Sequence, residues 1–265
     1  MTSQSALIYG PQDPPLCTKT LGTVIEEQAV AYGDRPAVVV PWQSVRLSYR
    51  DLAERSLVVA KALLSTGCIR RGDCVGIMAG NCYQYVEVFL GATRIGCPVV
   101  VLNNTYTPDE LRNAVSISCM YSNGASWPVL ARPLTTKACR ILFISPAIGT
   151  QSLQGHIDGL GDKTDLQHIV TLDNAYTAFT SSQDTDLVGD ALCKHVQNGI
   201  RAEDILNLQF TSGKPTSCAK LGCPCPAHAH NPGTTGSPKA AMLTHMYVRR
   251  LRLTRHTRTD KTETS

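Results

Sequence analysis

Two short stretches late in the chain contain the residue types that bind phosphate in proteins. "FTSG" ends at Gly213, and "TTGSPK" ends at Lys239. Glycines let backbone amides approach phosphate oxygens, Thr and Ser hydroxyls add donors, and a lysine adds a point charge. Either stretch alone is typical of a surface turn. Joined without residues 214–233, they read "LNLQFTSGTTGSPKAAMLTH", which is a strand followed by a phosphate-binding loop.

The joined string resembles the phosphate-loop signature of the adenylate-forming superfamily, which includes acyl-CoA synthetases, luciferases and the adenylation domains of peptide synthetases. That signature reads Thr-Ser-Gly-Thr-Thr-Gly, any residue, then Pro-Lys-Gly, and Ala240 stands in place of its last glycine. The segment "NNTYTPDEL" is similar to the Asn-Pro-x-Tyr-x-x-x-Glu-Leu segment of medium-chain acyl-CoA synthetase-like members. With the insertions set aside, the resemblance covers about residues 21–245.

The resemblance implies an acid–thiol ligase. A carboxylic acid, by resemblance a fatty acid, attacks the α-phosphorus of ATP to give an acyl-adenylate and pyrophosphate, and coenzyme A then displaces AMP. Magnesium offsets the phosphate charge. No catalytic residue and no metal ligand is assigned in this chain. By resemblance, the β- and γ-phosphates of ATP are held by Thr211, Ser212, Gly213, Thr234, Thr235, Gly236 and Lys239.

Two segments interrupt this pattern. The first insert, residues 119–138, separates a helix from a strand, and the second insert, residues 214–233, divides the phosphate loop. Long structureless insertions are uncommon inside a compact domain. The second insert could fold around zinc, although Cys-x4-Cys-x-Cys-x2-His-x-His is not a usual spacing for a structural zinc site. The candidate zinc ligands are Cys218, Cys223, Cys225, His228 and His230.

The second insert could instead be a natural loop insertion, which phosphate binding makes costly, or a translated intron, which we favour. Gly213-Lys214 can be encoded GGT-AAG, which contains a splice donor, and Pro232-Gly233 can be CCA-GGN, which contains an acceptor. The first insert can hold similar strings at Cys119-Met120 and near its end. The two inserts are equally long, and each can be removed in frame.

Strands alternate with helices along the chain, which predicts an α/β fold with a mostly parallel sheet and helices on both faces. By resemblance this is the incomplete N-terminal part of the adenylate-forming large domain. Ser48 with Asp51, and Thr107 with Pro108, are typical of helix starts. Residues 177–190 look like a surface loop. Helices are expected within 23–34, 48–67, 82–96 and 107–118, and strands within 36–40, 45–49, 73–81, 97–103, 139–146, 167–173 and 202–213.

The composition fits one large domain or two small ones: 265 residues, 43% of them hydrophobic, with a net charge of +4. We expect an N-terminal segment (1–20), a partial AMP-binding domain (21–245) that contains both inserts, and an unrelated basic tail (246–265). The overall charge is too mild to imply a nucleic-acid partner. The basic stretch 249–261 is expected to be a solvated, disordered tail.

No apolar run approaches the roughly 20 residues of a membrane span, and neither a signal peptide nor a Ser-Lys-Leu ending is visible. We therefore expect a cytoplasmic protein. Isolated cysteines in apolar segments indicate reduced, buried thiols, here Cys68, Cys74, Cys82 and Cys97. Full members of the family are about twice as long. The ribose-binding aspartate and the mobile C-terminal domain have no matching position, so we expect an N-terminal fragment of the ligase that is inactive as it stands. The alternatives are a catalytically dead fragment that at most binds nucleotide, and a zinc-binding interaction module formed by the second insert.

Overall fold

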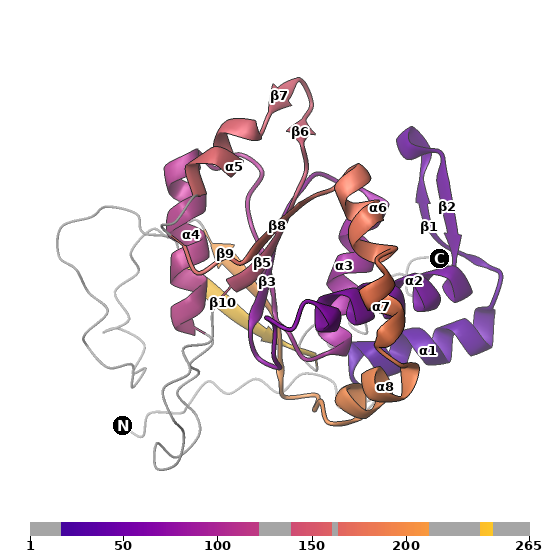
Figure 1. Cartoon of the computed structure of the whole chain (residues 1–265). Coiled ribbons are helices and arrows are strands. Elements are labelled where there is room, and N and C mark those ends of the chain that lie inside the picture. The colour runs from indigo at the N-terminus through magenta and orange to yellow at the C-terminus, as the bar shows by residue number, and fades with distance from the viewer. Residues whose placement is uncertain (1–16, 122–138, 161–163, 212–238, 246–265) are drawn as a thin grey trace, which may run out of the picture.

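A six-stranded sheet forms the centre of the protein. The structure is a computed structural model, and it describes residues 17–121, 139–160, 164–211 and 239–245. Helices lie on either side of the sheet (Figure 1), and its strands lie in the order β10-β9-β4-β3-β5-β8. Five of them are parallel, and only the pairing of β10 with β9 is antiparallel. Their bounds are β3 Cys74–Met78, β4 Val99–Val101, β5 Cys139–Ile144, β8 His168–Thr171, β9 Ile205–Thr211 and β10 Lys239–Thr244.

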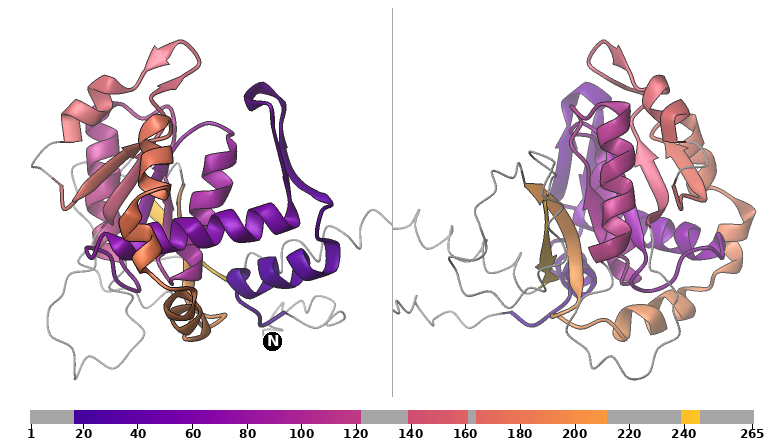
Figure 2. Two further views of the ribbon diagram at one scale, coloured as in Figure 1. Left: turned by 45° about the vertical axis from the view of Figure 1, so that its right-hand side comes forward. Right: turned by 90° about the vertical axis from the view of Figure 1, so that its left-hand side faces the viewer.

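Helices cover both faces of the sheet (Figure 2), as the sequence pattern predicts. On one face, α2 (Tyr49–Ser65), α3 (Tyr83–Arg94), α6 (Asn174–Thr180) and α8 (Asp190–Asn198) enclose a core that includes Val75, Ile77 and Phe143. On the other face, α4 (Pro108–Tyr121) and α5 (Gln154–Leu160) pack over Met78, Val100 and Leu142. Both faces of the central strands are therefore buried, which explains their continuous apolar runs.

The remaining elements lie around this three-layer body. Helix α1 (Leu21–Tyr32) packs against α2, and α7 (Gln183–Leu187) follows α6. A hairpin projects from the body beside α2 (Figure 1) and is formed by β1 (Pro36–Val40), the 3-10 turn η1 (Pro41–Gln43) and β2 (Val45–Ser48). A second, shorter hairpin is formed by β6 (Ala147–Ile148) and β7 (Gln151–Ser152).

The predicted helix starts are confirmed. Ser48 caps α2 and forms a reciprocal capping box with Asp51. Thr107 does the same for α4: its amide donates to Glu110 Oε2 at 2.8 Å, and the Glu110 amide donates to Thr107 Oγ1 at 3.3 Å. Each cap satisfies backbone amides that the first helical turn leaves without partners, and contributes about 1 kcal/mol.

Several expectations about local structure were wrong. Residues 177–190 are not a loop, since they contain the end of α6 and all of α7. Helical spacing predicts one apolar face of α1 that includes Ile25 and Val30, but Val30 is 90% exposed. Cys68 and Cys82 are only half-buried, whereas Cys74 and Cys97 are buried as expected. Helix α4 continues to Tyr121, into the first insert, whose residues 122–138 lie outside the described part of the chain.

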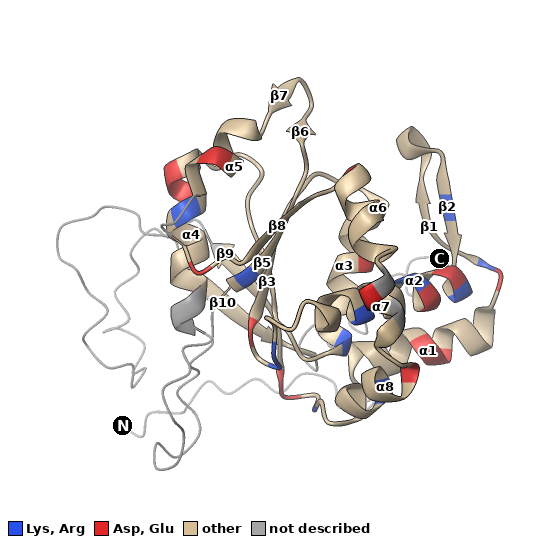
Figure 3. Cartoon of the chain, in the orientation of Figure 1, with Lys and Arg blue, Asp and Glu red and all other residues tan. Residues whose placement is uncertain are grey.

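Charged residues of both signs are dispersed over the helices, and the central strands contain few (Figure 3). Two charged side chains are nevertheless buried on α3. Glu87 is 3% exposed; it accepts a hydrogen bond from the Tyr176 hydroxyl at 2.6 Å and pairs with Arg55 Nη1 at 3.2 Å. Burial raises the pKa of Glu87, while Tyr176 and Arg55 favour its charged form. These contacts join α3 to α2 and α6.

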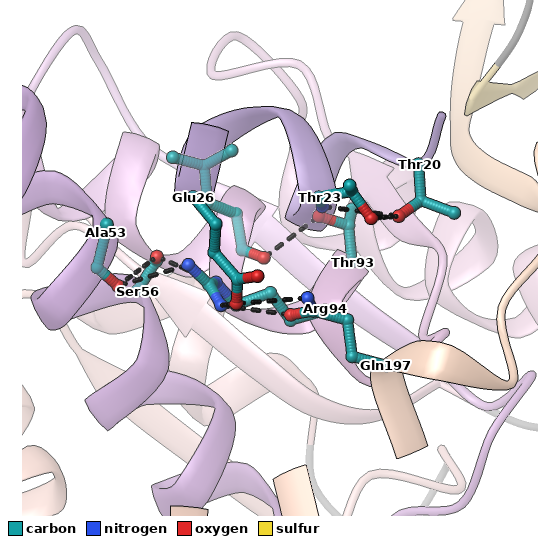
Figure 4. Close-up of polar contacts among 9 residues, drawn as sticks. Thr20, Thr23, Glu26, Ala53, Ser56, Thr93, Arg94 and Gln197 are labelled. Atoms are coloured by element: carbon teal, nitrogen blue, oxygen red, sulfur yellow. Dashed lines mark hydrogen bonds and ion pairs between the residues drawn. The ribbon is translucent and has the colours of Figure 1, made fainter. Parts of the chain in front are cut away.

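The second buried charge is Arg94, at the end of α3, which is 3% exposed (Figure 4). Its guanidinium donates to Glu26 Oε1 at 2.9 Å on α1, and to Gln197 Oε1 at 2.9 Å on α8. It also donates to Ser56 Oγ at 3.0 Å and to the Ala53 carbonyl at 3.2 Å, both on α2. Burial lowers the pKa of Arg94, and Glu26 opposes that effect. One side chain therefore connects four helices.

His245 connects the end of β10 to the start of α1. Its ring is 2% exposed, and Nδ1 accepts a hydrogen bond of 3.0 Å from the Leu21 amide. An imidazole nitrogen can accept only when it carries no proton, so the contact requires the neutral ring. Burial lowers the pKa of His245 to about 4, and the negative charge of Asp204 opposes this shift.

We expect acid to destabilise the protein through His245. Below its ordinary pKa of about 6.5 the unfolded chain binds a proton that the folded chain excludes, so stability falls between about pH 6.5 and 4. The loss is of the order of 2–3 kcal/mol. His245→Gln keeps an acceptor for Leu21 without titrating. Its urea midpoint should therefore change less between pH 7 and 4.5 than that of the unmodified chain.

The difference in urea midpoint between the unmodified chain and the His245→Gln variant reports on His245 alone, because the carboxylates titrate in both proteins. Asp51 and Asp173 have lowered pKa values and add to the loss in acid, while Glu87 has a raised pKa and acts in the opposite direction. Equal midpoint changes in the two proteins would show that His245 does not hold its neutral form in the folded state.

Candidate phosphate-binding site

The two ends of the expected phosphate loop meet in the sheet. Thr211 is the last residue of β9, Lys239 is the first residue of β10, and the antiparallel register makes them direct partners. Thr211 also marks the carboxyl end of a parallel strand, where ligands bind in open α/β sheets. Two of the seven expected phosphate-binding residues are therefore brought together, although 27 residues separate them, the segment 212–238.

The other expected residues lie outside the described part of the chain. These are Ser212, Gly213, Thr234, Thr235 and Gly236, together with the whole second insert and its candidate zinc ligands. Without the second insert, only residues 212–213 and 234–238 would connect the paired ends. The hairpin formed by β9 and β10 is thus compatible with a compact loop at the position where the sequence places one.

The strands that hold these ends are fixed by the core on one side of the hairpin. Leu206 and Leu208 of β9 are each 1% exposed, and Ala240 of β10 packs beside the same cluster. Strand β10 was not expected from the sequence, where its residues are read only as the end of the loop motif. The alternating register shows why it forms: Ala240 lies opposite Phe210, and Met242 lies opposite Leu208.

The loop after β4 contains the motif "NNTYTPDEL" and lies next to the carboxyl end of β9. Asn103 Oδ1 accepts from the Thr105 amide at 3.0 Å, which tightens the turn. The turn directs Tyr106 inward, and its ring packs edge-on against Phe210, with centroids 6.5 Å apart. The motif that carried part of the family resemblance therefore contacts the residue that precedes Thr211.

An open cleft of about 530 Å³ lies at the carboxyl ends of β3 and β5. Its walls come from the segments after these strands and from Trp42 of the projecting hairpin, whose indole Nε1 donates to the Asn81 carbonyl at 3.2 Å. Gln43 accepts from the Tyr83 amide at 2.9 Å and so caps α3. The lining residues are Trp42, Gly80, Asn81, Cys82, Ser145, Ala147, Ile148 and Gly149.

A mostly parallel sheet between layers of helices, with a cleft at the carboxyl ends of two strands, places the protein in the α/β class, in which ligands bind at that edge of the sheet. The chain belongs to the AMP-binding enzyme family, whose family description matches residues 25–214. This confirms the resemblance and the fold class expected from the sequence. The match ends at Lys214, the first residue of the second insert.

Curated relatives of the chain include acyl-CoA ligases of fungi. It is 35% identical over 250 residues to the acyl-CoA ligase SID4 of Ajellomyces capsulatus and 36% identical over 251 residues to the acyl-CoA ligase sidI of Aspergillus fumigatus. Each alignment covers 91% of this chain but only 36% of the relative. The chain therefore spans little more than a third of the length of these relatives.

Solved structures share the fold. One is titled "anthranilate CoA ligase AuaEII in complex with anthranoyl-AMP", with a TM-score of 0.60 and 19% sequence identity. The superposition covers 89% of this chain and 35% of the chain in that structure. Another is the N-terminal domain of FACL13 from Mycobacterium tuberculosis, with a TM-score of 0.60 and 17% sequence identity. Here the superposition covers 86% of this chain and 44% of the chain in that structure. Within the described ranges, no helix is both long and apolar enough to cross a bilayer.

Three features near the site are not predicted by the sequence. These are strand β10, the contact between Tyr106 and Phe210, and the role of Trp42 in the cleft. The short apolar run in "KAAML", directly after a segment with glycine and proline, is a signal for a strand that could have been used. The other two features depend on contacts between distant segments, and no local pattern in the sequence indicates them.

Proposed function

We propose that the chain is the N-terminal part of an acid–thiol ligase that activates a carboxylic acid with ATP and transfers the acyl group to coenzyme A. The observation that carries the proposal is the pairing of Thr211 with Lys239 at the carboxyl end of β9. The names of the fungal relatives support the reaction class. A fatty acid as the substrate rests on the resemblance to medium-chain members.

The residues of this chain act on the nucleotide. Backbone amides of the glycine-containing loop and the hydroxyls of Thr211, Ser212, Thr234 and Thr235 would hold the β- and γ-phosphates, and Lys239 would add a fixed positive charge. In an uninterrupted loop such donors would be held in place before ATP binds and would stabilise the charge that develops as pyrophosphate leaves. Magnesium would share this charge, and its ligands are not assigned.

We further propose that the chain as it stands does not complete the reaction. We infer that the second insert, which lies in the sequence between the donors on the β9 side of the loop and those on the β10 side, prevents them from surrounding one phosphate group together. The chain then acts at most as a nucleotide-binding fragment.

The test is ATP–pyrophosphate exchange with carboxylic acids of increasing chain length. We expect the purified chain to show no exchange above a Lys239→Ala variant for any acid. Exchange above that variant would contradict the proposed inactivity, and its dependence on the acid would then identify the substrate. Absence of exchange together with ATP binding after removal of the second insert would support both parts of the proposal.

A further inference from the structure

A buried histidine holds the loop that follows β4. His156 of α5 is 6% exposed, and its Nε2 lies 2.7 Å from the Tyr106 carbonyl oxygen. A carbonyl can only accept, so Nε2 carries the proton and donates. Because the bond is to backbone, it fixes the path of the chain at Tyr106 and thereby the direction of the Tyr106 side chain.

The helix that carries His156 is itself anchored. Arg112 Nε of α4 donates to the Gly159 carbonyl at 3.0 Å. Gly159 lies so close to α4 that an added Cβ would approach Pro108 Cβ to 3.3 Å. Leu153, which directly precedes α5, and Leu160, its last residue, are fully buried. Helix α5 is therefore a rigid support rather than a mobile surface segment.

The Tyr106 ring connects this anchored region to the strand that leads into the phosphate loop. It meets the Phe210 ring edge-on, at an interplanar angle of 76°. Phe210 precedes Thr211 on β9, and its partner Ala240 follows Lys239 on β10. Both ends of the loop are thus one residue from the position that Tyr106 packs against.

We propose that His156 and Tyr106 are positioning residues for the phosphate loop, acting through Phe210 on the paired Thr211 and Lys239. The inference rests on the proposed function, because it assigns the two residues to ATP binding. His156 fixes the backbone of the loop after β4 through its hydrogen bond to Tyr106. The Tyr106 ring fixes the position of the Phe210 ring, and Phe210 fixes the spacing and direction of the two ends of the phosphate loop.

The first experiment measures amide hydrogen exchange in the full chain. Tyr106→Leu and His156→Ala should each speed exchange of the Phe210, Thr211 and Ala240 amides by about tenfold, the factor expected for loss of roughly one net hydrogen bond or ring contact. Exchange in β5 and β8 should stay unchanged. Tyr106→Phe keeps the ring, and His156→Gln keeps a donor, so both should restore slow exchange. His195→Ala, at an exposed histidine, is the matched control.

The second experiment measures the Kd for ATP with magnesium after deletion of residues 214–233. Tyr106→Leu should raise the Kd by about tenfold in that background, and Tyr106→Phe should not. The inference would be overturned if the Tyr106 and His156 variants left amide hydrogen exchange unchanged. It would also be overturned if amide exchange became faster in Tyr106→Leu while its Kd for ATP stayed the same. If the deletion variant binds no ATP while exchange responds as expected, the proposed function fails and the contact is only structural.

Discussion

Deleting residues 214–233 should lower the Kd of the chain for ATP with magnesium by about 100-fold or more. The donors on the two sides of the loop act together only when they surround the same phosphates, and each charge-assisted hydrogen bond contributes about 1.5–3 kcal/mol. Loss of two such bonds already exceeds a factor of 100. Because Thr211 and Lys239 are already paired, the shortened loop closes on a preformed hairpin.

The same deletion should change folding stability far less than it changes binding. Loop-closure entropy grows only with the logarithm of loop length, so the second insert costs about 1 kcal/mol. Binding is measured by equilibrium dialysis with labelled ATP. Deletion of residues 119–138, an insert of the same length outside the loop, is the matched control and should not create affinity. A Lys239→Ala change should weaken binding in the shortened chain, and an unchanged Kd after the first deletion would contradict the account.

Arg94→Ala should reduce the free energy of unfolding by about 3–5 kcal/mol, the range for breaking a buried ion pair. The change removes the hydrogen bonds that Arg94 donates to Gln197 Oε1 and Ser56 Oγ, while the Ala53 carbonyl keeps its hydrogen bond from Ser56 Oγ. Glu26 is 39% exposed, so water partly compensates its lost partner and the effect should fall toward the lower end. Urea unfolding at pH 7 measures the difference.

Two further variants show whether the geometry of the Arg94 guanidinium matters. Arg94→Lys keeps the charge but cannot reach four groups at once, so we expect an intermediate loss of about 1–2 kcal/mol. Arg50→Ala breaks an ion pair with Asp34 in which both side chains are exposed, and should cost less than about 1 kcal/mol. Equal losses for Arg94→Ala and Arg50→Ala would show that the four-helix junction does not depend on Arg94.

Much of the fold follows from local sequence. The helix starts at Ser48 and Thr107 are predictable because a cap and its partner lie within one turn. The buried strands β3, β4 and β5 are predictable because helices cover both faces of the sheet, which requires continuous apolar runs. Residues 177–190 were mistaken for a loop because their polar composition hides two short helices, which tertiary packing stabilises.

The site could be predicted only in part. The types and order of the residues predict a phosphate loop once the second insert is set aside, and the structure places the backbone of two of the expected residues, Thr211 and Lys239. The pairing of Thr211 with Lys239 across the second insert depends on tertiary structure, so no local pattern in the sequence predicts it. The chain of contacts from His156 through Tyr106 to Phe210 joins three separate elements, so no spacing in the sequence indicates it.

The most direct test of the central claim, that residues 214–233 interrupt a single phosphate loop, is to sequence the transcript across residues 116–140 and 210–239. The account predicts a message in which Gly213 is followed directly by Thr234, with the first insert absent as well. A message that encodes both inserts, from codons that lack the donor and acceptor strings, would contradict it. The cell would then make a chain with a divided loop, and its function would lie outside ligase catalysis.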